Sequence, residues 1–212
     1  MDDASETRLV RVWDPLIRIG HWVLVVAFAT AYLTEGEPQW LHSFAGYAIA
    51  VTVALRILWG LVGPRPARFS DFLTGPGRVF AYLRDLLTGG AERHLGHSPA
   101  GGAMTLALLF ALAVTALSGM ATLAVEEGQG PLAGIVTSAS LPASAEEDED
   151  HDEYGEHGEG GGAEAFEEIH EVAANVTLLL IVLHVAGVAW ASRAHGENLV
   201  RAMIDGRKRS VE

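Results

Sequence analysis

The chain has 212 residues, a formal net charge of −13 and no cysteine. The absence of cysteine excludes disulfides, thiolate metal sites and iron–sulfur clusters, and leaves imidazole and carboxylate as the only strong metal ligands. The acidic charge alone would suggest a soluble protein, but 50% of the residues are hydrophobic and they concentrate in four long segments. We expect no nucleic-acid partner.

The four apolar segments are residues 17–34, 41–63, 103–125 and 170–191. Each is about long enough to cross a bilayer as a helix, which takes about 20 residues. The first segment has no small-residue cleavage site after it and three more follow, so we interpret it as a span and not as a signal peptide. The sequence therefore predicts that residues 1–212 form a single all-α domain, an integral membrane four-helix bundle surrounded by lipid.

Basic residues are confined to three regions of the chain. All fourteen Arg and Lys lie before residue 19, between residues 56 and 93, or after residue 192. The positive-inside rule places these regions in the cytoplasm, so both termini are cytoplasmic and the 35–40 and 126–169 connections face outward. We therefore expect a multi-pass membrane protein.

The connections and the tail have patterns of their own. Between the second and third spans, "DFLTGPGRVFAYLRDLL" has apolar residues at helical spacing, which predicts a short amphipathic helix on the cytoplasmic surface. The tail "ENLVRAMIDGRKR" has a similar amphipathic pattern and is expected to extend the fourth span into the cytoplasm. The outer loop 126–169 contains "SAEEDEDHDEYGEHGEGGGAEAFEE" and is expected to be disordered when alone, because it is acidic, Gly-rich and of low complexity.

Four histidines lie in the spans at two depths. His21 opens the first span near the cytoplasmic surface, and His42 opens the second near the outer surface. His170 and His184 are fourteen residues apart on the fourth span. That separation is within roughly 40° of four full helical turns and corresponds to about 21 Å, so the two rings share a face but cannot share a metal ion. Because the fourth span runs inward, depth pairs His42 with His170 and His21 with His184.

Two imidazoles from different helices at one depth are the axial ligands that a six-coordinate haem b requires, and the chain has no Cys-x-x-Cys-His motif for covalent attachment. A single histidine at the edge of a span is more often an interfacial residue, but four that match in depth favour two haems b. Gly46, Ala174 and Gly187 share the ligand faces and leave room for a flat macrocycle. Small residues of this kind also serve ordinary helix packing.

Five segments resemble one known family: "VWDPLIRIGHW", "LHSFAGYAIAVTVALRILWGLVG", "RFSDF", "GHSPAGGAM" and "ENLVRAMIDGRKR". They are similar to the bacterial cytochrome b561 proteins, which include the b-type subunits of nickel–iron hydrogenases. The resemblance covers nearly the whole chain and implies a protein of the bacterial inner membrane. It also implies two haems b, ligated at His21, His42, His170 and His184, that exchange electrons with membrane quinone. Residues 143–168 depart from the family's usual shorter loop, which leaves the redox partner open.

Two further positions near the cytoplasmic surface have more than one interpretation. Arg56 lies fourteen residues after His42 and either extends to the interface or compensates the charge of a propionate of the inner haem, and the two roles are compatible. His97 is expected at the surface or near quinone, as is His94, and His97 is also an alternative ligand.

The remaining histidines are expected outside the haem sites. His195 follows the fourth span and is expected at the membrane interface. His151 and His157 lie among the carboxylates of the outer loop, where they could bind a divalent metal weakly or simply belong to a solvated loop.

The sequence predicts a di-haem electron carrier between the quinone pool and a basic periplasmic redox protein such as a c-type cytochrome, with quinone oxidoreductase activity left open. A metal-ion or proton transporter that uses the membrane histidines is the alternative from another class. The apolar region between the two histidine levels, interrupted only by Thr30, Thr52 and Thr177 on the three histidine-bearing spans, suits electron transfer better. A b-type anchor subunit of a hydrogenase-like complex would differ only in having a dedicated partner.

Overall fold

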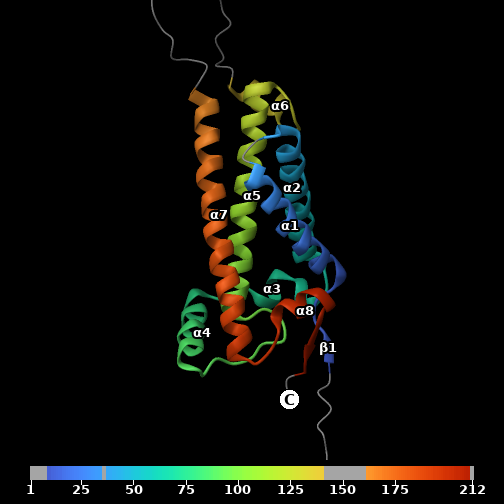
Figure 1. Cartoon of the computed structure of the whole chain (residues 1–212), viewed down its shortest axis with the longest axis vertical. Helices are drawn as coiled ribbons and strands as arrows, with labels where there is room; N and C mark the ends of the chain where they lie inside the picture. Colours follow the sequence, from blue (N-terminus) through green and yellow to red (C-terminus); the bar gives the residue numbers. More distant parts are fainter. Residues whose placement is uncertain (1–8, 35–36, 141–160, 211–212) are drawn as a thin grey trace, which may run out of the picture.

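The computed structural model describes residues 9–34, 37–140 and 161–210 (Figure 1). Within these residues, four helices are long and apolar enough to cross a membrane. They correspond to the four spans expected from the sequence, so the prediction of an all-α membrane bundle is confirmed. The four helices are α1 (Pro15–Thr34), α2 (Gln39–Val62), α5 (Pro99–Glu127) and α7 (Gly161–Ala194).

The shorter elements gather at the two ends of the bundle (Figure 1). One end, which we call the terminal end, contains the described chain termini, and α6 (Ala133–Ser140) marks the opposite α6 end. The amphipathic helix expected from the sequence is α4, which lies at the terminal end. The terminal end comprises β1 (Leu9–Arg11), η1 (Arg65–Ala67), α3 (Phe69–Phe72), α4 (Pro76–Thr88), α8 (Leu199–Asp205) and β2 (Arg207–Arg209).

Polar side chains cap the starts of two membrane helices. Asp14 Oδ1 accepts a hydrogen bond from the backbone N–H of Ile17 at 3.0 Å where α1 begins. Ser98 Oγ accepts one from the backbone N–H of Gly101 at 3.1 Å where α5 begins. In both cases the next residue is a proline, whose fixed φ suits the first helical position, so the sequence defines both starts.

The tail does not continue the fourth span as expected. α7 ends at Ala194, and Gly196 adopts a φ of +56°, a left-handed conformation that stops the helix. Asn198 Oδ1 then accepts from the backbone N–H of Arg201 at 2.8 Å and starts α8 as a separate helix. The prediction of one extended helix is wrong because the glycine ends one helix and the asparagine caps another.

The outer connection is shorter than the expected loop 126–169. α5 continues to Glu127, α6 follows, and α7 already begins at Gly161. The first turns of α7 are helical although they are acidic, because carboxylates such as that of Glu164 interact favourably with the N-terminal end of a helix dipole. Residues 141–160, which hold most of the low-complexity run, lie outside the described residues. The disorder expected for this run therefore stays a prediction.

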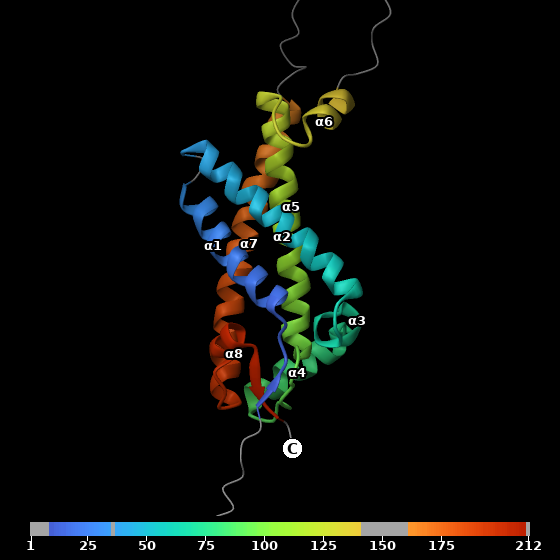
Figure 2. The ribbon, with the colours of Figure 1, turned by 90° about the vertical axis from the view of Figure 1, so that its right-hand side faces the viewer.

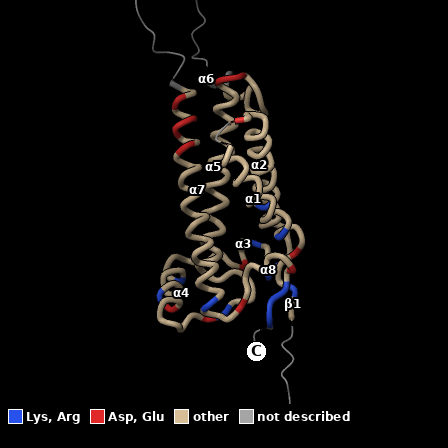
Figure 3. The backbone as a smooth tube through the Cα atoms, in the orientation of Figure 1, with Lys and Arg blue, Asp and Glu red and all other residues tan. Residues whose placement is uncertain are grey.

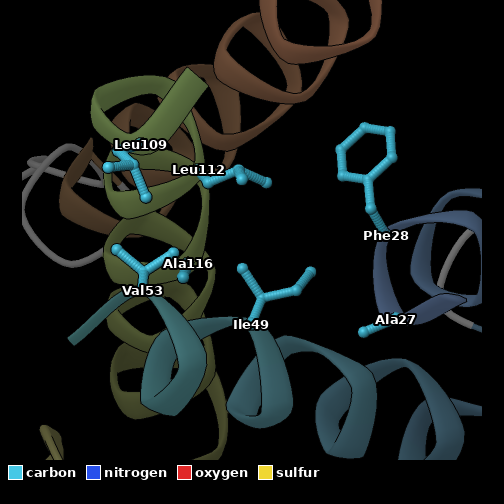
Figure 4. Packing of buried hydrophobic residues seen from close by; sticks show 7 residues of the cluster. All are labelled: Ala27, Phe28, Ile49, Val53, Leu109, Leu112 and Ala116. Atoms are coloured by element: carbon cyan, nitrogen blue, oxygen red, sulfur yellow. The ribbon is translucent and has the colours of Figure 1, made fainter. Parts of the chain in front are cut away.

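Two helix pairs make up the bundle. α1 packs on α2 and α5 packs on α7, while α2 also contacts α5 and joins the pairs. α7 has few backbone contacts with α1 or α2, and Figure 2 shows α1 and α2 inclined to the α5–α7 pair. The main core lies where α1, α2 and α5 meet, and Figure 4 shows its members: Ala27, Phe28, Ile49, Val53, Leu109, Leu112 and Ala116. Because lipid is as apolar as these side chains, close packing and not exclusion of water holds them together.

A two-stranded sheet ties the beginning of the described chain to its end. β1 and β2 are antiparallel, with Val10 opposite Lys208. The carbonyl of Gly206 accepts hydrogen bonds from the backbone N–H groups of Val12 at 2.9 Å and Trp13 at 3.2 Å. Gly206 has a φ of +79°, and a Cβ there would lie 2.7 Å from the Trp13 carbonyl oxygen, so only glycine fits. This contact fixes the chain just before α1.

The charges separate along the bundle. Figure 3 shows Lys and Arg toward the terminal end, whereas the first turns of α7 at the α6 end carry Glu. This is the distribution from which the orientation in the membrane was predicted, and that orientation stays a prediction.

Candidate cofactor site

His42 and His170 lie opposite each other toward the α6 end. Their ring centres are 6.0 Å apart and the ring planes are inclined by 71°. His42 Nδ1 donates to the Ala31 carbonyl of α1 at 3.0 Å, and His170 Nδ1 donates to the Thr115 carbonyl of α5 at 2.8 Å. A carbonyl oxygen only accepts, so both Nδ1 atoms carry the proton and each Nε2 keeps a lone pair for a metal.

α5 provides a close-fitting seat for the His170 ring. A Cβ on Gly119 would lie 2.7 Å from Cε1 and 2.9 Å from Nδ1 of His170, so a side chain there would overlap the ring. Ser118 Oγ is 3.4 Å from His170 Nδ1. Sequence reasoning missed Thr115, Ser118 and Gly119. The available signal was a run of small and hydroxyl residues at spacings of three and four in the third span, which has no histidine of its own.

His21 and His184 form the second pair, nearer the terminal end. Their ring centres are 6.4 Å apart and the planes are inclined by 54°. His21 Nδ1 is buried and has no hydrogen-bond partner in the described chain. A buried ring nitrogen without a protein partner is costly unless another group satisfies it, so its partner is expected to come from outside the described chain.

Both pairs have the spacing of axial ligands. An imidazole nitrogen binds a first-row metal at about 2.0 Å and lies about 1.1 Å from the ring centre, so two imidazoles on opposite sides of one iron have ring centres about 6.2 Å apart. The observed separations of 6.0 and 6.4 Å lie on either side of this value. A Cβ on Gly46 or Gly187 would meet no protein atom within 4 Å, which leaves room beside His42 and His184. The residues present therefore fit haem b.

Each histidine pair supplies two metal ligands. The described residues contain no group of three or more His, Asp or Glu side chains that could hold a metal ion. A macrocycle such as that of haem would supply the remaining ligands. His151 and His157 lie outside the described residues, and a weak metal site there stays a prediction.

Apolar packing separates the two pairs. Along α7 the two levels are about 21 Å apart, and no titratable side chain lies between residues 172 and 183. Leu178 and Ile181 pack against the main core at this depth. Thr177 is fully buried, and its hydroxyl donates to the Ala173 carbonyl at 2.8 Å and lies 3.2 Å from the Thr115 hydroxyl. These two hydroxyls are therefore bonded to each other and to the backbone.

Arg56 is buried within the terminal half of the bundle. Its side chain is only 9% exposed, and its Cζ lies 5.0 Å from the ring centre of Phe69. Nη1 and Nη2 have no hydrogen-bond partner among the residues that the structure describes. Of the two roles considered for Arg56, this burial favours the inward-facing one.

The structure does not bring His97 to any of the four candidate ligands. Its ring packs against Trp13 and Phe72, with ring centres 4.7 and 4.1 Å away. Burial, and secondarily the nearby charges of Arg56 and Lys208, lower the pKa of His97 to about 3, so the ring is neutral near pH 7.

Two other histidines have protein partners at the terminal end. His94 Nδ1 donates to the Glu92 carbonyl at 3.0 Å. His195 Nε2 lies 3.3 Å from the Tyr82 hydroxyl, and its pKa is lowered mainly by burial. Neither ring faces another histidine at axial-ligand spacing.

The family model described as prokaryotic cytochrome b561 matches residues 12–206. This range contains the full length of all four long helices, and it contains all four paired histidines. No curated protein and no solved structure matches the chain.

Proposed function

The chain belongs to the prokaryotic cytochrome b561 family, and we propose that it is a di-haem b protein that passes electrons between the quinone pool and a periplasmic redox partner. The match confirms the family predicted from the sequence, and with it a membrane b-type cytochrome of electron transport. The number of haems, their ligands, the quinone and the partner are the content of the proposal.

The observation that carries the proposal is the facing of two histidine pairs at two depths. The separations of 6.0 Å for His42 and His170 and 6.4 Å for His21 and His184 support one iron at each level. Haem supplies reversible one-electron chemistry when it is bound. α7 contributes one ligand to each level, so a single helix sets the distance between the two sites.

The surrounding residues orient the ligands and exclude water. Hydrogen bonds from Nδ1 of His42 and His170 to backbone carbonyls fix the ring orientations and make the free nitrogens more basic. The apolar packing between the levels offers no relay of titratable groups, which supports electron transfer over a histidine-based ion or proton transporter.

The charge distribution supports an orientation with the terminal end in the cytoplasm of a bacterium. The acidic α6 end would then face the periplasm and suit a basic redox partner. A reporter domain fused after Glu212 should be cytoplasmic, and one inserted near Gly160 should be periplasmic. The reverse result would overturn the orientation. Co-purification of a hydrogenase-like complex would instead identify the chain as its b-type anchor subunit.

An optical spectrum of the purified protein tests the proposal. The dithionite-reduced form should show the sharp α and β bands of low-spin haem, and a pyridine haemochrome assay should give about two haems b per chain. One haem per chain, or a high-spin spectrum, would contradict two bis-histidine sites. Quinol-dependent reduction in vesicles then tests the exchange with quinone.

A further inference from the structure

Arg56 is a buried cation without a counter-ion in the described chain. No described carboxylate lies within ion-pair distance of it. Asp14 acts on it electrostatically, but the oxygens of Asp14 already accept hydrogen bonds from the backbone N–H of Ile17 at 3.0 Å and from Trp59 Nε1 at 3.1 Å. A buried guanidinium is costly unless its charge and donors are met, so its partner is expected to come from outside the described chain.

The contact of Arg56 with Phe69 leaves the hydrogen-bond donors of the guanidinium without an acceptor. Cζ lies 5.0 Å from the ring centre, within the range of a cation–π contact. Nη1 and Nη2 are both buried and unpartnered. Together they present a fork that matches the two oxygens of a carboxylate.

His97 supplies a second free donor on the same aromatic cluster as Arg56. The Phe69 ring, which Arg56 contacts, has its centre 5.8 Å from that of Phe72, and the Phe72 ring centre lies 4.1 Å from that of His97. His97 Nδ1 is sealed from solvent and has no hydrogen-bond partner in the described chain. The ring is held by Trp13 and Phe72 and is neutral near pH 7, so Nδ1 can donate a hydrogen bond without adding another buried charge.

The surroundings of this donor pair attract negative charge. Lys208 is buried nearby and donates to the His94 carbonyl at 3.3 Å. α5 starts directly after His97 with Ser98 as its N-cap, and the N-terminus of this 29-residue helix contributes a positive potential. A group with two negative oxygens is therefore the most favourable occupant.

Arg56 lies at the level of the inner histidine pair. It is fourteen residues beyond His42 on α2, and His184 is fourteen residues beyond His170 on α7, which runs in the same direction. A haem held by the inner pair carries its two propionates at the edge of the macrocycle, near this depth.

We infer that Arg56 and His97 together bind a propionate of the inner haem. This inference rests on the proposed function, because it needs a haem between His21 and His184. The guanidinium charge stabilises the reduced haem, which has one positive charge fewer than the oxidised form, and so raises its midpoint potential. His97 acts as a positioning residue that holds the same carboxylate.

A redox titration of the purified full-length protein with both haems bound tests the inference. Arg56→Gln should lower the midpoint potential of the inner haem only and leave both haems bound. His97→Phe keeps an aromatic ring between Trp13 and Phe72, and it should lower the same potential by less. Arg65→Gln is the matched control, because Arg65 is an exposed arginine at the same end, and it should leave both potentials unchanged.

A second arm asks whether the carboxylate is the partner. The apoproteins of the wild type and of Arg56→Gln are loaded with the dimethyl ester of haem b, which has no free carboxylate. The difference between their inner potentials should then be smaller than with native haem, because the ester no longer holds the guanidinium beside the macrocycle. Arg56→Lys, which keeps the charge without the fork, serves the same comparison if the Gln variant does not fold.

The two ways to fail are distinguishable. An equal shift in native and ester haem, a shift confined to the outer haem, or no shift at all would overturn the role of Arg56 and His97 while leaving two haems in place. If the proposed function is wrong, the wild type itself will lack the inner haem, and His21→Ala will leave its haem content unchanged.

Discussion

Gly119 of α5 lies directly against the imidazole of His170, with no space for a side chain between them. A Cβ at this position would be 2.7 Å from His170 Cε1, closer than non-bonded carbon atoms approach. The Thr115 carbonyl, 2.8 Å from Nδ1 of the same ring, holds it from the same helix. α5 therefore determines how α7 presents His170 to His42, although α5 contributes no ligand.

Gly119→Ala should consequently disturb the outer haem and spare the inner one. Overpacking of this kind costs about 1–3 kcal/mol, and the cheapest relief is to move the His170 ring away from its carbonyl acceptor. We expect the Ala variant to lose most of the outer-haem component in a redox titration. Gly77→Ala is the control, since a Cβ there meets nothing within 4 Å. An unchanged outer haem would show that the close contact between Gly119 and His170 is not required for haem binding.

Alanine variants of the four histidines test the pairing itself. His42→Ala and His170→Ala should remove the same spectral and redox component, because their rings face each other at 6.0 Å. His21→Ala and His184→Ala should remove the other component, and each variant should retain about one haem per chain. Loss of one shared component in His42→Ala and His21→Ala would show that the pairing by depth is wrong.

The haem of the His42–His170 pair is expected to have the lower midpoint potential. Both of its imidazoles donate Nδ1–H to backbone carbonyls, which raises their basicity and stabilises ferric iron, whereas neither His21 nor His184 forms such a bond in the described chain. The buried charge of Arg56 lies near the pair of His21 and His184 and is expected to raise the midpoint potential of the haem bound there. In a titration of the wild type, the component absent from His170→Ala should be the one that is reduced last as the potential falls. The opposite order would mean that these hydrogen bonds do not dominate.

The depth pairing was accessible from the sequence, but its supporting residues were not. Helical rise and the distribution of Arg and Lys are enough to place His170 opposite His42, because both follow from spacing along the chain. The role of Gly119 depends on which face of α5 meets α7, and an evenly apolar span does not specify that face. The burial of His97 against Trp13 likewise depends on contacts between segments far apart in the chain. The apolar pattern of the tail does not show that Gly196 adopts a left-handed conformation and ends α7.

The ion pair between Arg93 and Glu197 at the terminal end should weaken in acid. Arg93 donates to Glu197 at 2.7 Å, and their side chains are only 23% and 8% exposed. Burial raises the pKa of Glu197, but the hydrogen bond and charge of Arg93, the backbone N–H of Arg209 and the charge of Lys208 outweigh it and leave the pKa lowered. A carboxyl whose pKa is lowered in the folded state contributes stability above its unfolded pKa of about 4.3, and this contribution is lost as pH falls through the folded value.

Glu197→Gln should therefore destabilise the terminal end by about 2 kcal/mol near pH 7, with little effect well below pH 4. Thermal unfolding followed across pH, with limited proteolysis of the tail, measures both effects. Asp205→Asn is the control because its pair with Arg201 is exposed, 79% and 40% for the two side chains, and such pairs contribute little. An equal loss of stability in the two variants, or a loss of stability in Glu197→Gln that persists in acid, would contradict a stabilising role of the Arg93–Glu197 ion pair.

The acidic α6 end is expected to attract a basic redox partner to the outer haem. Residues 126–171 contain fifteen carboxylates and no Arg or Lys, and Glu164, Glu167 and Glu168 are exposed on the first turns of α7, within two turns of His170. A dense negative surface raises the local concentration of a cationic protein and speeds its encounter, and salt screens this effect over about 10 Å at 0.1 M.

Replacing the three glutamates by Gln should leave both haem spectra intact but slow electron transfer to a basic c-type cytochrome about tenfold at low salt. The rates of the variant and the wild type should converge as the ionic strength rises. Asp71→Asn, at the terminal end, should change neither rate. If the triple variant and the wild type react equally fast at low salt, these three carboxylates do not steer the partner.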